Sequence, residues 1–185
     1  MKGCRLSPVS RLHFHCNYDI ATFDDNLWCQ LVKAPLFDTL KEMCIILIKP
    51  WSKAITEALS IRTAVFVQEQ GVPEELELDQ FDSDAHHVLA YLGSICVGTA
   101  RLIEPGGEKG QIGRIAVLDG YRRNGIGSEL LKTLLKLGRS RGIKEFELHA
   151  QVMTIPFYQN LGFSPFGEAY DEAGIPHRNM ILILK

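Results

Sequence analysis

The chain has 185 residues, of which 46% are hydrophobic and 23% are charged, a composition typical of a folded globular protein and not of a disordered one. Its 20 Lys and Arg residues against 22 Asp and Glu residues give a formal net charge of −2, which provides no overall positive field, so we predict no nucleic-acid partner. The longest strongly apolar run, Cys44–Ile48, is far shorter than the roughly 20 residues of a membrane helix, and we predict no membrane association.

Five cysteines lie along the chain, at Cys4, Cys16, Cys29, Cys44 and Cys96. Their odd number and the absence of any C-x-x-C pair argue against a disulfide framework and against a zinc site. This pattern favours reduced thiols in a cytoplasmic protein without a bound metal.

Residues 1–43 differ from the rest of the chain, because neither the alternation of a strand nor the periodicity of a helix is sustained in them. We interpret them as an N-terminal extension, and the regular patterns that follow as one domain over residues 44–185. Met43 stands directly before the first regular pattern, so a start of the chain at that residue is an open alternative.

The domain begins with signals for a strand, a helix and a hairpin. The apolar run Cys44–Lys49 predicts a strand, and Ala54–Gln68 places apolar residues three or four apart, as one face of a helix requires. Glu74–Asp84 is expected to be a solvated acidic loop. The two runs that follow, His87–Leu92 and Ile95–Ile103, predict a hairpin.

The second half of the domain continues the alternation of strands and helices. The expected elements are a strand at Gln111–Leu118, a leucine-rich helix at Leu130–Leu137, an alternating strand at Lys144–Ala150, a short helix at Pro156–Leu161, and strands at Phe163–Phe166 and Arg178–Leu184 joined by a turn at Gly174–Pro176. The whole order predicts an α/β domain.

A glycine-rich turn, Arg122–Gly127, connects a predicted strand to the leucine-rich helix. Its glycines let the backbone turn tightly where the first amides of the helix have no partners. Such a helix start, flanked by arginines, indicates an anion or phosphate site, although a plain connecting turn would need the same glycines. The Walker sequence is absent and Leu130 breaks the dinucleotide fingerprint, so a nucleotide-binding oxidoreductase is a weaker alternative.

Two motifs stand in order in the second half of the chain, Arg122–Gly127 and Phe157–Phe163. The first resembles the R/Q-x-x-G-x-G/A motif of the GNAT superfamily of acetyl-CoA-dependent N-acyltransferases, and the second resembles that family's F-Y-x-x-x-G-F signature. Phe66–Gln70 and Tyr170–His177 are similar to a small bacterial branch, the ElaA-like acetyltransferases. The resemblance covers residues 44–185. It implies a mixed, mostly antiparallel sheet flanked by helices, with the fourth and fifth strands splayed apart.

The resemblance also implies a binding site for acetyl-CoA as a co-substrate. The amides of the glycine-rich turn would hold the pyrophosphate, and the end of the strand before it would pair with the pantetheine arm. A glutamine stands where the family often has an asparagine against that arm. The residues implied are Ile115, Ala116, Val117, Arg122, Arg123, Asn124, Gly125, Ile126, Gly127, Ser128 and Gln151.

N-acetyl transfer requires a neutral amine, a hydrogen-bond donor for the oxyanion and an acid for the leaving thiolate. The Val117 N–H suits the oxyanion, and Tyr158 stands at the family's position for the acid. The base is open between Glu69 and His149, because the predicted fourth strand contains no carboxylate. Deprotonation relayed by water would need neither side chain.

We therefore predict transfer of an acetyl group from acetyl-CoA, by direct attack in a ternary complex, to an amine acceptor. The acceptor is a small amine, an amino-acid derivative or a protein amine. A non-catalytic CoA-binding or regulatory module of the same fold is the alternative. The sequence leaves the acceptor and the oligomeric state open, a homodimer included.

Overall fold

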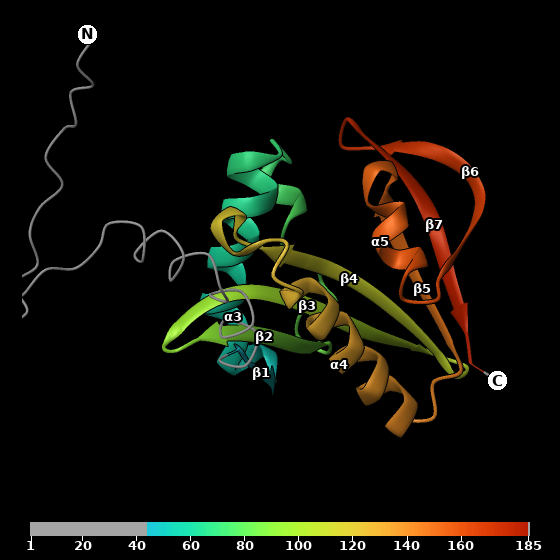
Figure 1. Ribbon diagram of the computed structural model, residues 1–185, viewed down its shortest axis with the longest axis horizontal. Helices are drawn as coiled ribbons and strands as arrows, with labels where there is room; N and C mark the ends of the chain where they lie inside the picture. The colour runs from blue at the N-terminus through green and yellow to red at the C-terminus, as the bar shows by residue number, and fades with distance from the viewer. Residues whose placement is uncertain (1–43, 185) are drawn as a thin grey trace, which may run out of the picture. The chain divides into compact units, whose positions relative to one another are not determined.

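Seven strands form one sheet in the structure, a computed structural model that describes residues 44–184. The predicted extension, residues 1–43, lies outside the described residues. The strands are β1 (Cys44–Lys49), β2 (His86–Leu92), β3 (Ile95–Gly106), β4 (Lys109–Val117), β5 (Glu145–Gln151), β6 (Ser164–Glu172) and β7 (Ile175–Ile183). Their order across the sheet is β1-β2-β3-β4-β5-β7-β6 (Figure 1).

Helices of several kinds connect these strands. The α-helices of the described residues are α3 (Trp51–Arg62), α4 (Ile126–Ser140) and α5 (Ile155–Gln159). The π-helix η1 (Thr63–Glu69) follows α3 directly. Single 3₁₀ turns are η2 (Glu74–Leu76), η3 (Asp119–Tyr121) and η4 (Val152–Thr154).

The predicted helix at Ala54–Gln68 is two elements in the structure. The α-helical part already begins at Trp51, because Pro50 stands in an extended conformation before the first turn, where its missing N–H is not needed. The last part widens into η1, where the Gln70 N–H donates to the carbonyl oxygen of Val65 at 3.2 Å. Such widened turns are frequent at functional sites, and η1 forms part of a cavity wall.

Buried apolar side chains cover both faces of the sheet. Side chains alternate along a strand, so Val88 and Ala90 of β2 pack in the cluster that contains the buried leucines of α4. Leu89 and Tyr91 pack with α3 instead. The two helices therefore cover opposite faces of β2, and each fully buried leucine of α4 stabilises the fold by roughly 1.5–3 kcal/mol.

β4 and β5 run parallel and pair over part of their length. The pairing joins Lys109–Ile112 to Glu145–Leu148 and stops there. Beyond it, β4 bends at a bulge against β3, with Arg114 in the left-handed region at φ 53°. Figure 1 shows the two strands meeting near the C-terminus and diverging toward their other ends. The predicted mixed, mostly antiparallel sheet with splayed fourth and fifth strands is confirmed.

The acidic segment Glu74–Asp84 is a mostly exposed loop, as its composition predicts, but two of its carboxylates are buried. Asp82 is 1% exposed, and its Oδ1 accepts hydrogen bonds from Arg62 Nη1 at 2.8 Å and Arg101 Nη1 at 2.7 Å. Glu77, also buried, accepts from the Arg62 Nε. For these two residues the prediction was wrong, because paired charges from α3 and β3 replace water around their carboxylates.

The last two strands are longer than the sequence predicts. The expected strand at Phe163–Phe166 continues to Glu172, and β7 already begins at Ile175. Between them Ala173 and Gly174 both have positive φ, at 54° and 79°. Two such residues form a tight hairpin turn, so the strands pair up to the turn itself.

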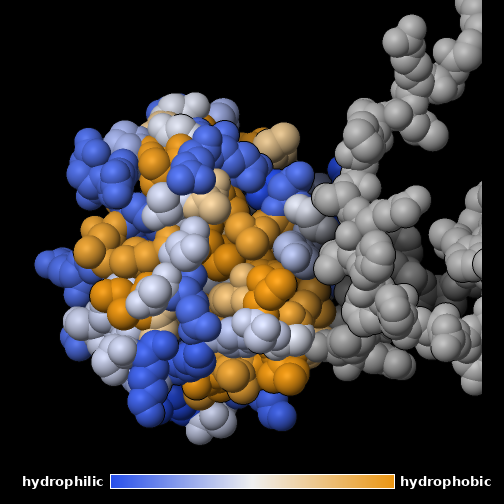
Figure 2. Space-filling model, turned by 90° about the vertical axis from the view of Figure 1, so that its left-hand side faces the viewer, coloured by the Kyte–Doolittle hydropathy of each residue, from blue (hydrophilic) through white to orange (hydrophobic). Residues whose placement is uncertain are grey.

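β1 lies at one edge of the sheet and carries exposed apolar side chains. Ile45, Leu47 and Ile48 of this strand are exposed, as is Ile95 at the β2–β3 turn. Figure 2 shows apolar residues gathered across the face that lies on the left of Figure 1. Within residues 44–184, β1 pairs with β2 alone, and an edge strand with exposed apolar side chains is typical of a contact surface.

Asp82 makes the stability of the fold depend on pH in the acid range. Burial alone opposes its ionisation, but hydrogen bonds and the positive charges of Arg62 and Arg101 prevail and lower the pKa of the carboxyl from 3.8 to about 2. Because the folded-state pKa lies below the unfolded one, the ionised carboxylate stabilises the fold above the unfolded pKa. This contribution, about 2 kcal/mol, is lost as the pH falls through the folded pKa.

Denaturant unfolding at a series of pH values checks this. We expect Asp82→Asn to be destabilised at neutral pH and to lose less stability on acidification than the wild type. Asp84→Asn is the matched control, because Asp84 is exposed in the same segment and should follow the wild-type curve. If the free energy of unfolding fell equally with pH in Asp82→Asn and in the wild type, Asp82 would not be the source of the acid dependence.

Candidate functional site

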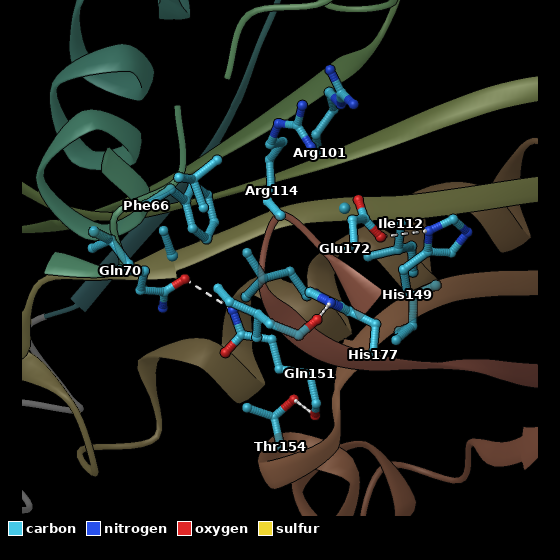
Figure 3. Close-up of a pocket in the computed structure, with 18 of the residues that line it drawn as sticks. Phe66, Gln70, Arg101, Ile112, Arg114, His149, Gln151, Thr154, Glu172 and His177 are labelled. Carbon is cyan, nitrogen blue, oxygen red and sulfur yellow. Dashed lines mark hydrogen bonds and ion pairs between the residues drawn. The ribbon is translucent and has the colours of Figure 1, made fainter. Parts of the chain in front are cut away.

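A cavity of about 540 Å³ opens where β4 and β5 diverge. Gln111–Val117 of β4 form one wall, and His149, Gln151 and His177 from β5 and β7 stand on the other. Side chains from η1 and the acidic segment complete the lining. Figure 3 shows side chains from these elements converging on the cavity. Cavities of this size hold small-molecule ligands.

The end of β4, Ile115–Val117, presents an open strand edge to the cavity. On one side β3 pairs with it, with Gly98 opposite Val117 and Thr99 opposite Ala116. On the other side the pairing with β5 has ended, so backbone groups of this stretch have no strand partner among residues 44–184. An extended ligand with amide groups is the chemistry that completes such an edge.

Tyr158 lies on α5 and contributes to the cavity lining. Its ring centroid is 4.9 Å from that of Phe157 and 6.1 Å from that of Phe163, both edge to face. Burial raises the pKa of the Tyr158 hydroxyl to about 12, so the group stays protonated at neutral pH. A protonated phenol in a cavity is a hydrogen-bond and proton donor.

Glu69 and Arg122, predicted as a base and a phosphate ligand, bind each other. The Arg122 Nη1 donates to Glu69 Oε1 at 2.7 Å, and Nη2 donates to Oε2 at 2.5 Å. The Arg122 Nε donates to the Val117 carbonyl oxygen at 2.8 Å. The pair lowers the pKa of Glu69 and raises that of Arg122. It joins η1 to the end of β4, and it leaves Glu69 poorly suited to accept a proton.

Two glutamines bridge the opening of the cavity. The Gln151 Nε2, from the end of β5, donates to the Oε1 of Gln70, from the end of η1, at 2.9 Å (Figure 3). The Thr154 Oγ1 donates to the Gln151 carbonyl oxygen at 2.8 Å and fixes the backbone where β5 ends. The predicted pantetheine contact Gln151 therefore faces η1 across the splay.

Two imidazoles stand on the wall formed by β5–β7. His149 Nδ1 lies 3.5 Å from Glu172 Oε2, and both side chains are about half exposed. His177 stands opposite Gln151 in the β5–β7 pairing, and its Nδ1 lies 2.8 Å from the Ile175 carbonyl oxygen. Because a carbonyl only accepts, the Nδ1 of His177 carries a hydrogen, and Nε2 keeps its lone pair in the neutral ring.

The glycine-rich turn leads into α4, and of its residues Arg122 lines the cavity whereas 123–127 do not. Gly125 has φ 78°, and the first backbone bond of α4 runs from the Glu129 N–H to its carbonyl oxygen at 3.1 Å. The amides of Ile126, Gly127 and Ser128 therefore have no partner within the helix, and no side chain caps them. Such amides and the helix dipole suit a phosphate group.

Two more predicted residues lie in the same turn. Arg123 is exposed and has φ 64°. The Asn124 Nδ2 donates to the Tyr121 carbonyl oxygen at 3.2 Å, while its buried Oδ1 has no partner among the described residues. The structure thus separates the predicted site into two parts, the turn at α4 and the cavity with Glu69, Arg122, His149, Gln151, Tyr158 and Ile115–Val117.

Sequence analysis gave no role to two arginines of the cavity. Arg101 of β3 is buried in the ion cluster of the acidic segment, and Arg114 of β4 lies beside it. The sequence signal that could have found them is an arginine within an apolar strand, because a buried arginine needs a partner for its charge.

Within residues 44–184, no three His, Cys, Asp or Glu side chains gather as ligands for a metal ion. The helices of this part of the chain are all too short or too polar to cross a membrane.

Comparison with known proteins identifies the class to which this fold and cavity belong. The family model described as "Acetyltransferase (GNAT) domain" matches residues 52–184, so the chain belongs to the GNAT acetyltransferase family. Acyl transfer is therefore its class of reaction.

The relatives agree with this family. Protein ElaA of Escherichia coli (strain K12) is 36% identical over 126 residues, which cover 66% of this chain and 82% of ElaA. The crystal structure of E. coli ElaA matches at TM-score 0.69 and 30% identity, over 75% of this chain and 99% of that one. The uncharacterized N-acetyltransferase YjcF of Bacillus subtilis (strain 168) is 36% identical over 128 residues, 69% of this chain and 91% of YjcF.

An acyl-CoA N-acyltransferase from Pseudomonas aeruginosa matches in structure at TM-score 0.67 and 29% identity, over 75% of this chain and 98% of that one. The resemblance to the GNAT family, with ElaA among the similar proteins, is confirmed.

Gly127 provides a test of the α4 start as a phosphate site. A Cβ there would meet ordinary contacts, the nearest being the Phe157 ring at 3.6 Å, so Gly127→Ala and Gly127→Glu should both fold. The glutamate would place a carboxylate among the free amides and repel a phosphate. We expect Gly127→Glu to lose detectable CoA binding in titration calorimetry, and Gly127→Ala to retain it. Equal affinities of the two variants would refute this site.

Proposed function

We propose that the protein is an N-acetyltransferase that moves an acetyl group from acetyl-CoA to an amine by direct attack in a ternary complex. The open edge of β4 at Ile115–Val117 is the observation that carries the proposal, because an extended pantetheine arm would complete it. The free amides at the start of α4 would meet the pyrophosphate. The description of the relative YjcF as an N-acetyltransferase supports an amine as the acceptor.

The reaction requires the amine nitrogen to attack the thioester carbonyl carbon. A C–N bond forms, the C–S bond breaks, the nitrogen loses a proton and the leaving thiolate gains one. In the intermediate the carbonyl oxygen carries a negative charge, and the Val117 N–H is our proposed donor to it. Arg122, which binds the carbonyl oxygen of the same residue, would hold this peptide in place.

Tyr158 is our proposed acid for the thiolate. Its side chain lines the cavity, and its raised pKa keeps the proton on the hydroxyl at the pH of the reaction. A CoA thiol is ordinarily a stronger acid than this phenol, so the tyrosinate left by the transfer would at once take up a proton again, either the one that the amine loses or one from water.

His149 is the better supported of the two bases that the sequence leaves open. Glu69 is held by both Nη atoms of Arg122 with a lowered pKa, which disfavours proton uptake. His149 lies on the cavity wall, and its described charged partner is Glu172, whose Oε2 lies 3.5 Å from the His149 Nδ1. Glu69 then serves to hold Arg122 rather than to accept a proton.

Tyr158→Phe tests the acid, because it removes the hydroxyl and keeps the packed ring. We expect turnover, followed as free thiol released from acetyl-CoA, to fall by roughly ten- to a thousand-fold if thiolate departure limits the rate, with little change in CoA affinity. Tyr121→Phe is the control, because Tyr121 does not line the cavity. Unchanged turnover in Tyr158→Phe would make the hydroxyl structural.

Substitution of His149 and of Glu69 distinguishes the two candidate bases. We expect His149→Ala to lower kcat by roughly 10²–10⁴-fold and to regain part of it with added imidazole. His86→Ala, which alters an exposed pair with Glu104 outside the cavity, is the control. Glu69→Gln should raise the KM for acetyl-CoA only a few-fold, as an exposed ion pair predicts. A large fall in kcat for Glu69→Gln with full activity in His149→Ala would exchange the two roles.

A non-catalytic CoA-binding module of the same fold is the alternative function. It predicts binding of acetyl-CoA without thiol release across a panel of amines, whereas the proposed function predicts release with at least one acceptor.

A further inference from the structure

Arg114 stands where β4 leaves β5, on a strained backbone. Its φ of 53° is unusual for a residue with a Cβ, and a bulge in the β3–β4 pairing accompanies it. Bulges re-aim side chains next to active sites. Here the side chain joins that of Arg101 at the end of the cavity beside the acidic segment (Figure 3).

The guanidinium of Arg114 is only partly occupied. Its Nε donates to the Glu77 carbonyl oxygen at 3.2 Å, and its Nη2 donates to the Leu76 carbonyl oxygen and to Asp79 Oδ2, both at 3.1 Å. Nη1 has no acceptor among the described residues, and a quarter of the side chain is exposed. Two N–H groups therefore remain for a ligand in the cavity.

Arg114 shares its carboxylate partners with the other two arginines of the cluster. Arg101 binds both oxygens of Asp79, at 2.7 and 2.8 Å, and shares Asp82 with Arg62. Arg114 binds Asp79 at 3.1 Å, its Nε lies 3.7 Å from Glu77 Oε1, and its other hydrogen bonds go to carbonyl oxygens. Burial lowers the pKa of Arg114, and together with the charges of Arg101 and Arg62 it prevails over the opposing charges of Glu77 and Asp79. A negatively charged ligand group beside Arg114 would offset the repulsion from Arg101 and Arg62.

The opposite wall of the cavity carries a negative charge. Glu172 is about half exposed, and its described partner is His149 at 3.5 Å. The cavity thus has a cation on the β4 wall and a carboxylate on the β6–β7 wall. A ligand with a positive and a negative group would complement both.

We propose that the acceptor is an amine that also carries a carboxylate, and that Arg114 binds this carboxylate while the amine points toward Val117 and Tyr158. The proposal rests on the acetyl transfer proposed above, since it names the acceptor of the same site. Arg114 precedes Val117 by three residues, at most ~10 Å of strand. The carboxylate and the amine of the acceptor are therefore separated by several carbon atoms.

Matched pairs of amines test this acceptor class. Thiol release from acetyl-CoA is measured with γ-aminobutyrate and ε-aminocaproate, each against the alkylamine of the same chain length. We expect kcat/KM to favour the amino acid by roughly 10- to 100-fold, as a charged hydrogen bond predicts, with glycine a poor acceptor because it is too short. In Arg114→Gln this ratio should fall to about one, and Arg114→Lys should restore part of it.

Asp79→Asn separates binding of the acceptor from loosening of the acidic segment. This substitution weakens the attachment of the segment but keeps the Arg114 guanidinium, so the preference for amino acids should remain. Equal use of amino acids and alkylamines by the wild type, or a preference that survives Arg114→Gln, would overturn the proposal.

A binding measurement tests the acceptor class independently of acetyl transfer. Calorimetry of ε-aminocaproate added to the CoA-saturated protein needs no turnover. Binding that is lost in Arg114→Gln supports the acceptor class even where no thiol is released, an outcome that would count against acetyl transfer alone. Absence of binding to the wild-type protein would refute the acceptor class.

Discussion

The end of pairing between β4 and β5 is the constraint on which the rest of the structure depends. Four residues of each strand hold the two halves of the sheet together, and beyond them the halves separate. α3 packs on β2–β4 and α5 packs on β5 and β6, whereas α4 covers β1–β4 and its Gly138 also meets Phe146 of β5, so this helix spans both halves. Backbone groups inside a protein need partners, and the open edge of β4 supplies them to a ligand. The cavity follows directly from this divergence.

The acidic segment imposes a second constraint, because it brings charges into the interior. A buried carboxylate is tolerated when cations pair with it, and Arg62 and Arg101 do so for Asp82. Loss of one partner would leave an uncompensated charge in a space without water. The cluster therefore fixes the segment against α3 and β3, and the segment in turn forms part of the cavity lining with Leu76 and Glu77.

The parts of the fold that could be predicted from the sequence are those with a local cause. The spacing of the apolar residues and the positions of glycine and proline predicted most strands and helices. The two sequence motifs predicted the turn before α4 and the position of Tyr158. The burial of Asp82 could not be predicted, because its partners lie 19 and 20 positions away in the chain. The orientation of Arg114 depends on a bulge that only the pairing with β3 defines. The pair of Glu69 with Arg122 joins residues 53 positions apart.

The hydrogen bond between Gln70 and Gln151 governs how the opening between the strands can be filled. A primary amide offers the same donor and acceptor as the amides of a pantetheine arm. An arm that passes between the two glutamines would replace each one's partner by a group of the same kind, so the number of hydrogen bonds is conserved in the exchange. The hydrogen bond that spans the splay in the free protein is therefore one that a pantetheine arm could replace, and neither glutamine would lose a partner in the exchange.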